Sequence, residues 1–201
     1  MLLSLAIWVP ILAGLLALVA GGNAGGDRDA PLVRMIALFG SIAGFLVTLP
    51  LYSGFELHNP AMQFVEHRAW IPHFNVFYTL GVDGISLLFI LLNSFITILV
   101  VIAGWTVIRQ RVAQYMGAFL IMSGLLNGVF SALDGLLFYV FFEATLIPMF
   151  VIIGVWGGAN RVYAALKFFL YTLFGSLLML VALLYLYNKS GGSFAIRDWW
   201  K

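Results

Sequence analysis

The segment Leu136–Trp156, LLFYVFFEATLIPMFVIIGVW, is an apolar stretch with a single acid, Glu143, in its middle. As an α-helix rising about 1.5 Å per residue, it would cross a hydrocarbon core of about 30 Å. Glu143 would then lie roughly 10 Å from one end and 20 Å from the other. Because an ionisable group at this depth costs at least a few kcal/mol, we expect Glu143 to face protein or trapped water and to take part in ion transfer. The alternative is a protonated glutamic acid that donates a hydrogen bond between helices, a role that glutamine would also fill.

Pro148 follows Glu143 by five residues in the same segment. A proline donates no backbone hydrogen bond, and its ring crowds the carbonyl four residues earlier, that of Ala144. The freed carbonyl could hold water beside the acid, as a proton path requires, although membrane helices also carry proline for packing alone. Pro148 is therefore a candidate accessory residue.

The composition indicates an integral membrane protein. Hydrophobic residues make up 63% of the 201 residues and charged residues only 9%, so most of the chain must be solvated by lipid. A net charge of +2 is too small to indicate nucleic acid as a partner. The chain has no cysteine, which excludes thiolate ligands for metals or iron–sulfur clusters. The three histidines share one polar connection in no familiar ligand spacing, so we expect no metal site.

Hydropathy predicts one transmembrane domain, residues 1–201, with six membrane-spanning helices. A polar connection over residues 53–83 separates the second and third spans and alternates in a strand-like way over 62–71 and 74–80, which predicts a short β-hairpin on the membrane surface. The tight turn at Asp134 and Gly135 predicts that the fourth and fifth spans are antiparallel neighbours. The expected spans are residues 2–20, 32–52, 85–107, 112–133, 136–156 and 162–187.

Basic residues predict the orientation of the chain in the membrane. One side collects six of them and the other side four, so we place the amino terminus outside the cytoplasm. The first set is Arg28, Arg34, Arg109, Arg111, Arg161 and Lys167, and the second is Arg68, Lys189, Arg197 and Lys201.

Three further charged residues lie at or near the ends of the expected spans. Asp83 and Asp134 come directly before the third and fifth spans, where we expect each to cap a helix, and Asp134 is also a candidate for proton exit. Lys167 lies about one turn inside the sixth span. Its amine could snorkel to the headgroups, or it could act with Glu143 through water as a proton relay, because a cation favours the ionised carboxylate.

Two motifs resemble a known family. The run DGLLFYVFFEATLIPMFVIIGVWGGANRVYAALKFFLYTLFGSLLML, residues 134–180, and the motif GVDGIS, residues 81–86, resemble subunit M of bacterial NADH:quinone oxidoreductase, or respiratory complex I, whose mitochondrial counterpart is subunit 4. The resemblance implies an antiporter-like subunit of the membrane arm, in the inner membrane, that translocates protons beside other antiporter-like subunits. It assigns Glu143 to the family's essential acid on helix five and Lys167 to its helix-six lysine.

The resemblance also sets limits on what this chain does alone. It places NADH, FMN, iron–sulfur clusters and quinone in other subunits. Family members are more than twice as long, so we expect the chain to be the amino-terminal part of the antiporter-like fold, truncated before the seventh span, unless the remainder is a separate polypeptide. Two other functions stay open: a cation/proton antiporter subunit without NADH, and a structural spacer in the membrane arm.

Overall fold

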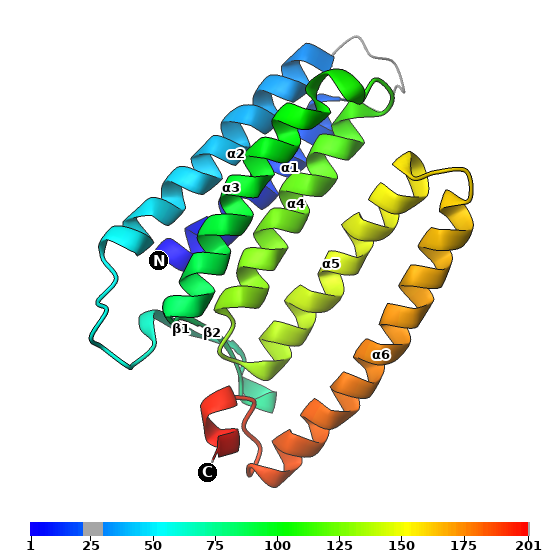
Figure 1. Ribbon diagram of the computed structural model, residues 1–201. Helices are drawn as coiled ribbons and strands as arrows, with labels where there is room; N and C mark the ends of the chain where they lie inside the picture. The colour runs from blue at the N-terminus through cyan, green and yellow to red at the C-terminus, as the bar shows by residue number, and fades with distance from the viewer. Residues whose placement is uncertain (22–29, 201) are drawn as a thin grey trace.

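The computed structural model of the protein describes residues 1–21 and 30–200; Arg28 and Lys201, which entered the orientation argument, lie outside them. Within these residues the chain forms six helices long and apolar enough to cross a membrane (Figure 1). The predicted all-helical membrane fold is confirmed. The helices are α1 Leu2–Ala20, α2 Ala30–Ser53, α3 Gly84–Val107, α4 Val112–Ser131, α5 Gly135–Trp156 and α6 Arg161–Lys189.

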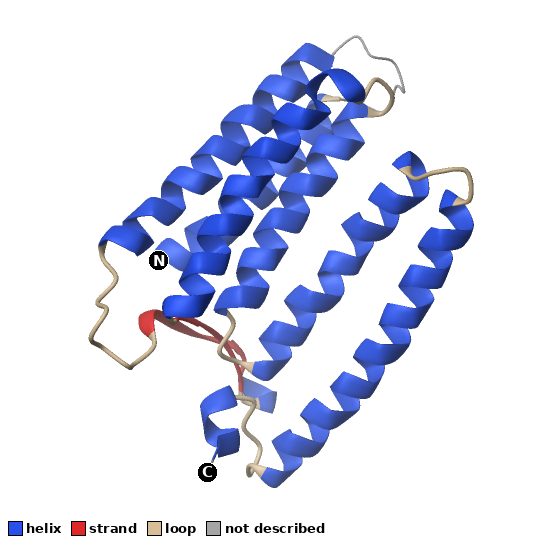
Figure 2. Cartoon of the chain, viewed as in Figure 1, coloured by secondary structure: helices blue, strands red, loops and turns tan. Residues whose placement is uncertain are grey.

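The predicted hairpin is also confirmed. Strands β1, Gln63–Ile71, and β2, Val76–Val82, pair antiparallel through a 3-10 turn at Pro72–Phe74. Asn75 ends this turn in the left-handed conformation, with φ of 52°, which asparagine tolerates better than most residues. The hairpin lies across one end of the helices, here named the hairpin end, where both chain termini also lie (Figure 2).

The turn between α4 and α5 pairs with the hairpin on one side and with the segment after α6 on the other. The Leu133 N–H donates to the carbonyl of Thr79 at 2.9 Å, and the Gly135 N–H donates to the carbonyl of Phe194 at 2.8 Å. The helix α4 therefore ends at Ser131, two residues earlier than expected, because Ala132 is extended and bridges to Leu80 of β2. These backbone bonds join both ends of the α5–α6 pair to the hairpin layer.

Small residues let α1 lie directly against α4. A Cβ atom added to Gly124 would lie 2.4 Å from the carbonyl oxygen of Ile7, and one added to Gly14 would lie 2.8 Å from the carbonyl oxygen of Gly117. Close approach at small residues is typical of helix pairs in membranes, and Gly124 is such a close-packing point. Gly175 in α6 differs, because a Cβ added there has no described atom of this chain within 4 Å.

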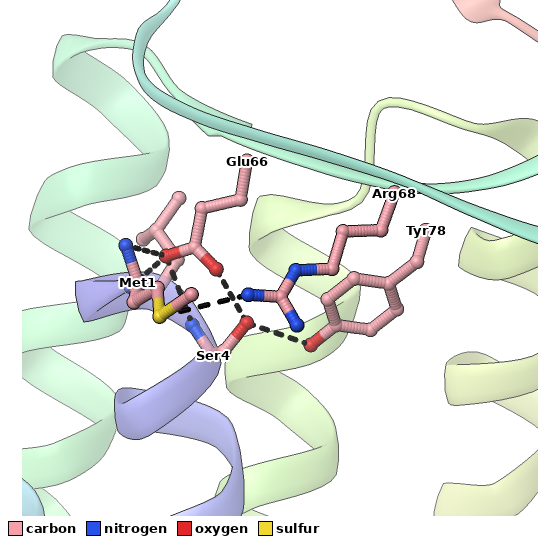
Figure 3. Close-up of polar contacts among 6 residues, drawn as sticks. Met1, Ser4, Glu66, Arg68 and Tyr78 are labelled. Atoms are coloured by element: carbon pink, nitrogen blue, oxygen red, sulfur yellow. Dashed lines mark hydrogen bonds and ion pairs between the residues drawn. The ribbon is translucent and has the colours of Figure 1, made fainter.

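The hairpin is fastened to the start of α1 by Glu66 (Figure 3). Its Oε1 atom accepts hydrogen bonds from the N–H groups of Leu3 at 2.9 Å and Ser4 at 3.4 Å, and lies 2.9 Å from the amino group of Met1. The Ser4 hydroxyl donates to Glu66 Oε2 and lies 3.2 Å from the hydroxyl of Tyr78. Met1 provides no side-chain cap for α1, so a carboxylate from β1 supplies the acceptor that the helix start needs.

Candidate functional site

The helix α5 begins at a cap that also anchors the hairpin. One carboxylate oxygen of Asp134 accepts the N–H groups of Leu136 at 3.0 Å and Leu137 at 3.1 Å, and the other accepts the N–H of Phe77 in β2 at 3.2 Å. Asp134 is only 1% exposed. Burial raises the pKa of this carboxyl above its ordinary value, and the three N–H donors oppose the shift. The predicted capping role of Asp134 is confirmed; a role in proton exit stays a prediction.

Asp83 caps α3 in a capping box, as expected. Its side chain accepts the Ser86 N–H at 2.7 Å, and the Ser86 hydroxyl accepts the Asp83 N–H at 2.9 Å. The hydrogen bond from the Ser86 N–H is the main reason that the pKa of Asp83 lies below its ordinary value. Asp83 therefore stabilises the start of α3.

Glu143 lies two turns into α5, about 12 Å from its first residue. Its side chain is half-buried, and its Oε2 atom is completely covered and has no hydrogen-bond partner among the described residues. The nearby hydroxyl of Thr145 donates at 2.6 Å to Phe142 of its own helix. A covered carboxylate oxygen without a donor is costly unless the group is protonated or meets water or a further partner.

Pro148 is buried inside α5, which continues past it to Trp156. Because proline has no N–H, the carbonyl of Ala144 loses its partner within the helix. None of the side-chain hydrogen bonds in the described part of the chain reaches that carbonyl. The carbonyl that Pro148 cannot pair with and the unpaired carboxylate oxygen therefore come from consecutive residues, Ala144 and Glu143.

The structure does not bring Lys167 together with Glu143. Lys167 lies about 9 Å inside α6, is exposed, and holds its Nζ atom 5.9 Å from the ring centre of Tyr163. Over residues 1–21 and 30–200 no ion pair joins the two side chains. Direct pairing is therefore not the arrangement here, and a coupling through water stays a prediction.

The sequence reasoning missed a group of buried and half-buried amides and hydroxyls between α1, α3 and α4. Asn93 donates to the carbonyl of Ser123 at 2.9 Å and to Oδ1 of Asn127 at 2.8 Å, and Thr97 donates to the Ser123 hydroxyl at 2.7 Å. Two asparagines inside apolar spans were the available signal, since an amide in lipid must find partners. We name this group the polar seam: Asn93, Ser94, Thr97, Ser123 and Asn127.

Comparison with known proteins agrees with the motifs around Glu143. A family model described as NADH:quinone oxidoreductase/Mrp antiporter, TM, matches residues 132–199. NADH-quinone oxidoreductase subunit M of Rhodobacter capsulatus is 51% identical over 192 residues, which cover 94% of this chain. The predicted resemblance to subunit M is confirmed.

Solved structures extend the similarity to three dimensions. A chain of respiratory complex I from Thermus thermophilus superposes with a TM-score of 0.78 at 34% identity, covering 98% of this chain and 38% of that chain. A chain of the Mrp complex from Dietzia sp. has a TM-score of 0.74 at 19% identity, over 96% of this chain and 20% of that one, which shows a shared fold. This chain spans only 36% of the Rhodobacter subunit M.

Proposed function

We propose that this chain is a proton-translocating, antiporter-like part of the membrane arm of an NADH:quinone oxidoreductase, with Glu143 as the acid that carries the proton. The observation behind the proposal is the covered Oε2 atom of Glu143, which has no partner in the described chain. An unpaired acid inside an apolar span is costly if its role is only structural. The relatives are subunits of NADH-quinone oxidoreductase, and electron transfer from NADH to quinone would drive the proton movement.

The residues around Glu143 suit a group that changes protonation state. The Ala144 carbonyl released by Pro148 can accept a hydrogen bond from water, and that water can donate to the ionised carboxylate. Lys167, in from the opposite end of the membrane, favours the ionised form through its charge when water connects them. Glu143 would take up a proton when this stabilisation weakens and release it when the stabilisation returns. Lys167 is thus assigned to modulation of Glu143.

The proposal includes the setting of the chain. The hairpin end would face the periplasm of a bacterial inner membrane, because the opposite end carries Arg34, Arg109, Arg111 and Arg161. Partners would be other antiporter-like membrane-arm subunits and lipid. NADH, FMN, iron–sulfur clusters and quinone would be bound by other subunits, in keeping with a chain that offers no thiolate ligand.

The test is NADH-driven acidification of inverted membrane vesicles from cells that carry Glu143→Gln. We expect a several-fold loss of protons moved per NADH oxidised, with the amount of assembled complex unchanged, because glutamine keeps the shape and loses the titratable proton. Glu143→Asp should retain part of the pumping. Glu56→Gln, at an exposed acid of the outer loop, is the matched control and should pump normally. Full pumping by Glu143→Gln would refute the proposal.

A second candidate is a cation/proton antiporter subunit that acts without NADH. The shared fold with the Mrp complex of Dietzia sp. favours it. That function predicts sodium-dependent proton movement in vesicles that lack NADH, again lost in Glu143→Gln. A purely structural spacer predicts that Glu143→Gln reduces assembly and leaves the ratio of protons to NADH unchanged.

A further inference from the structure

Pro10 interrupts α1 in the same way that Pro148 interrupts α5. It lies inside the helix and has no N–H, so it cannot donate to the carbonyl of Ala6, four residues earlier. In a lipid-solvated span each freed carbonyl must find another donor or remain a cost of several kcal/mol. The Nδ2 atom of Asn127 in α4 donates to this carbonyl at 2.9 Å. The amide of Asn127 thus replaces the hydrogen bond that Pro10 removes.

The remaining bonds of Asn127 reach α3. Its Oδ1 atom accepts the amide of Asn93 at 2.8 Å, and its Nδ2 atom lies 3.3 Å from the Ser94 hydroxyl. Asn127 is 1% exposed, so water does not compete for these bonds. One side chain therefore connects three helices within the apolar interior and is the centre of the polar seam.

The next residue of α4 faces α5. A Cβ atom added to Gly128 would lie 2.7 Å from the ring of Phe141, which is 7% exposed and precedes Glu143 by two residues. The Phe141 ring therefore packs directly against the α4 backbone at Gly128, and the position of the ring depends on the position of α4. Since Asn127 fixes α4 against α1 and α3, its bonds also determine the wall on which this part of α5 packs.

We propose that Asn127 is a positioning residue. It substitutes for the N–H missing at Pro10, fixes α4 against α1 and α3, and through the contact of Gly128 with Phe141 sets the place of Glu143 in the membrane. The last step rests on the proposed proton transfer by Glu143. The first two steps do not, and they can be measured without it.

A double-mutant cycle between Asn127 and Pro10 isolates the first steps. The variants are Asn127→Leu, Pro10→Ala and both together, in the assembled complex purified from native membranes. Leucine removes the amide at similar size, and alanine restores the N–H that Ala6 needs. We expect Asn127→Leu to lower the temperature at which the subunit leaves the complex by about 2–4 °C, and Pro10→Ala to recover part of this loss, because the restored N–H serves Ala6 and not Asn93 or Ser94. If Asn127→Leu does not assemble, assembly of the double variant would equally show that Pro10→Ala compensates for the loss of Asn127.

Ser131→Ala is the matched control, because Ser131 is equally buried in α4 and donates only to carbonyls of its own helix. It should be insensitive to Pro10→Ala. An equal loss for Asn127→Leu with and without Pro10 would overturn the proposed substitution for the missing N–H.

The positioning step is read from protons moved per NADH in the Asn127 variants at equal amounts of assembled complex. We expect Asn127→Leu to lower this ratio, Pro10→Ala to restore it in part, and Asn127→Gln to retain more of it. A normal ratio in assembled Asn127→Leu, where Glu143→Gln pumps poorly, would overturn the positioning role alone. Normal pumping by Glu143→Gln would instead refute the proposed function. The result of the double-mutant cycle on thermal stability would still be valid.

Discussion

The helices α1 and α5 each contain a proline, and the two freed carbonyls meet different surroundings. The carbonyl of Ala6 in α1 receives the amide of Asn127. The carbonyl of Ala144 in α5 receives no side-chain donor in the part of the chain described, and the carboxylate of Glu143 beside it has a covered oxygen without a partner. The freed carbonyl of α1 is therefore paired within the protein, whereas the carboxylate oxygen of Glu143 in α5 remains able to bind water or another partner.

The helices α1–α4 are also packed more closely than the α5–α6 pair. Half of the α4 span is buried, against 11% of the α6 span, and the hydroxyls of Thr172 and Ser176 in α6 donate to their own helix. The helices α1–α4 form a scaffold held by close backbone contacts and the polar seam. The α5–α6 pair is attached to it through α4 and through the backbone bonds at the hairpin end. The proposed proton-carrying acid thus lies beside the closely packed scaffold and outside it.

The glycines of the two regions provide the strongest test of this difference. Gly124→Val would push a side chain into the carbonyl of Ile7 and should reduce the assembled subunit strongly, because overpacking against backbone costs about 1–3 kcal/mol or more. Gly175→Val in α6 is the matched substitution and should have little effect, since nothing described lies within 4 Å. Immunoblots of native gels at equal expression give the comparison.

Equal losses for the two glycine variants would break the contrast. They would show that the face of α6 around Gly175 is covered by protein in the complete assembly. A loss at Gly124 alone would confirm that the scaffold is the part sensitive to side-chain volume.

Asp134 joins the two regions and should give the next largest effect. Asp134→Ala leaves the N–H groups of Leu136, Leu137 and Phe77 without their acceptor and should cost about 1–2 kcal/mol of stability. Asp134→Asn keeps one oxygen to cap the helix but turns an NH2 group toward the Phe77 N–H, so it should cost less than Asp134→Ala without being neutral. Thermal release of the subunit at pH 7 measures both variants.

The pH dependence of these variants follows from the raised pKa of Asp134. Burial favours the protonated form in the folded state, so the contribution of Asp134 to stability declines as pH rises from its unfolded pKa to its folded pKa. Asp134→Asn should abolish this decline. If Asp134→Asn assembles and yet pumps poorly, the carboxyl takes part in proton transfer, and a capping role alone is contradicted.

Much of the fold could be predicted because its signals are local. Hydropathy marks each span, the position of Asp83 or Asp134 before an apolar run marks a helix start, and alternation marks the hairpin. The motif around Glu143 marks the family. The contribution of Asn127 could not be predicted, because it depends on a contact with Ala6, 121 residues away in sequence. A proline and an asparagine in separate spans give no sign that one compensates for the other.

The fastening of the hairpin was also beyond the sequence. Glu66 is 62 residues from Ser4, and only the strand register brings its carboxylate to the start of α1. The alternation of β1 predicts which face Glu66 occupies, but not the helix end that it meets. Contacts of this kind decide how the hairpin sits on the scaffold, and they are open to test by pH.

Glu66 should give the smallest effect, which in the wild type appears only in acid. Burial raises the pKa of Glu66, but hydrogen bonds from Ser4 and the nearby amino group outweigh this, so the pKa lies below the ordinary 4.5. The stabilisation is therefore complete above pH 4.5 and is lost as pH falls through the folded pKa. Hydrogen exchange at the amides of Leu3 and Ser4 should accelerate over that range in the wild type. In Glu66→Gln exchange should be faster at neutral pH and nearly independent of this transition, while Glu56→Gln should follow the wild type. Unchanged protection of both amides in Glu66→Gln would show that α1 begins without help from the hairpin. The hairpin would then contribute nothing to the stability of the α1–α4 scaffold at this point.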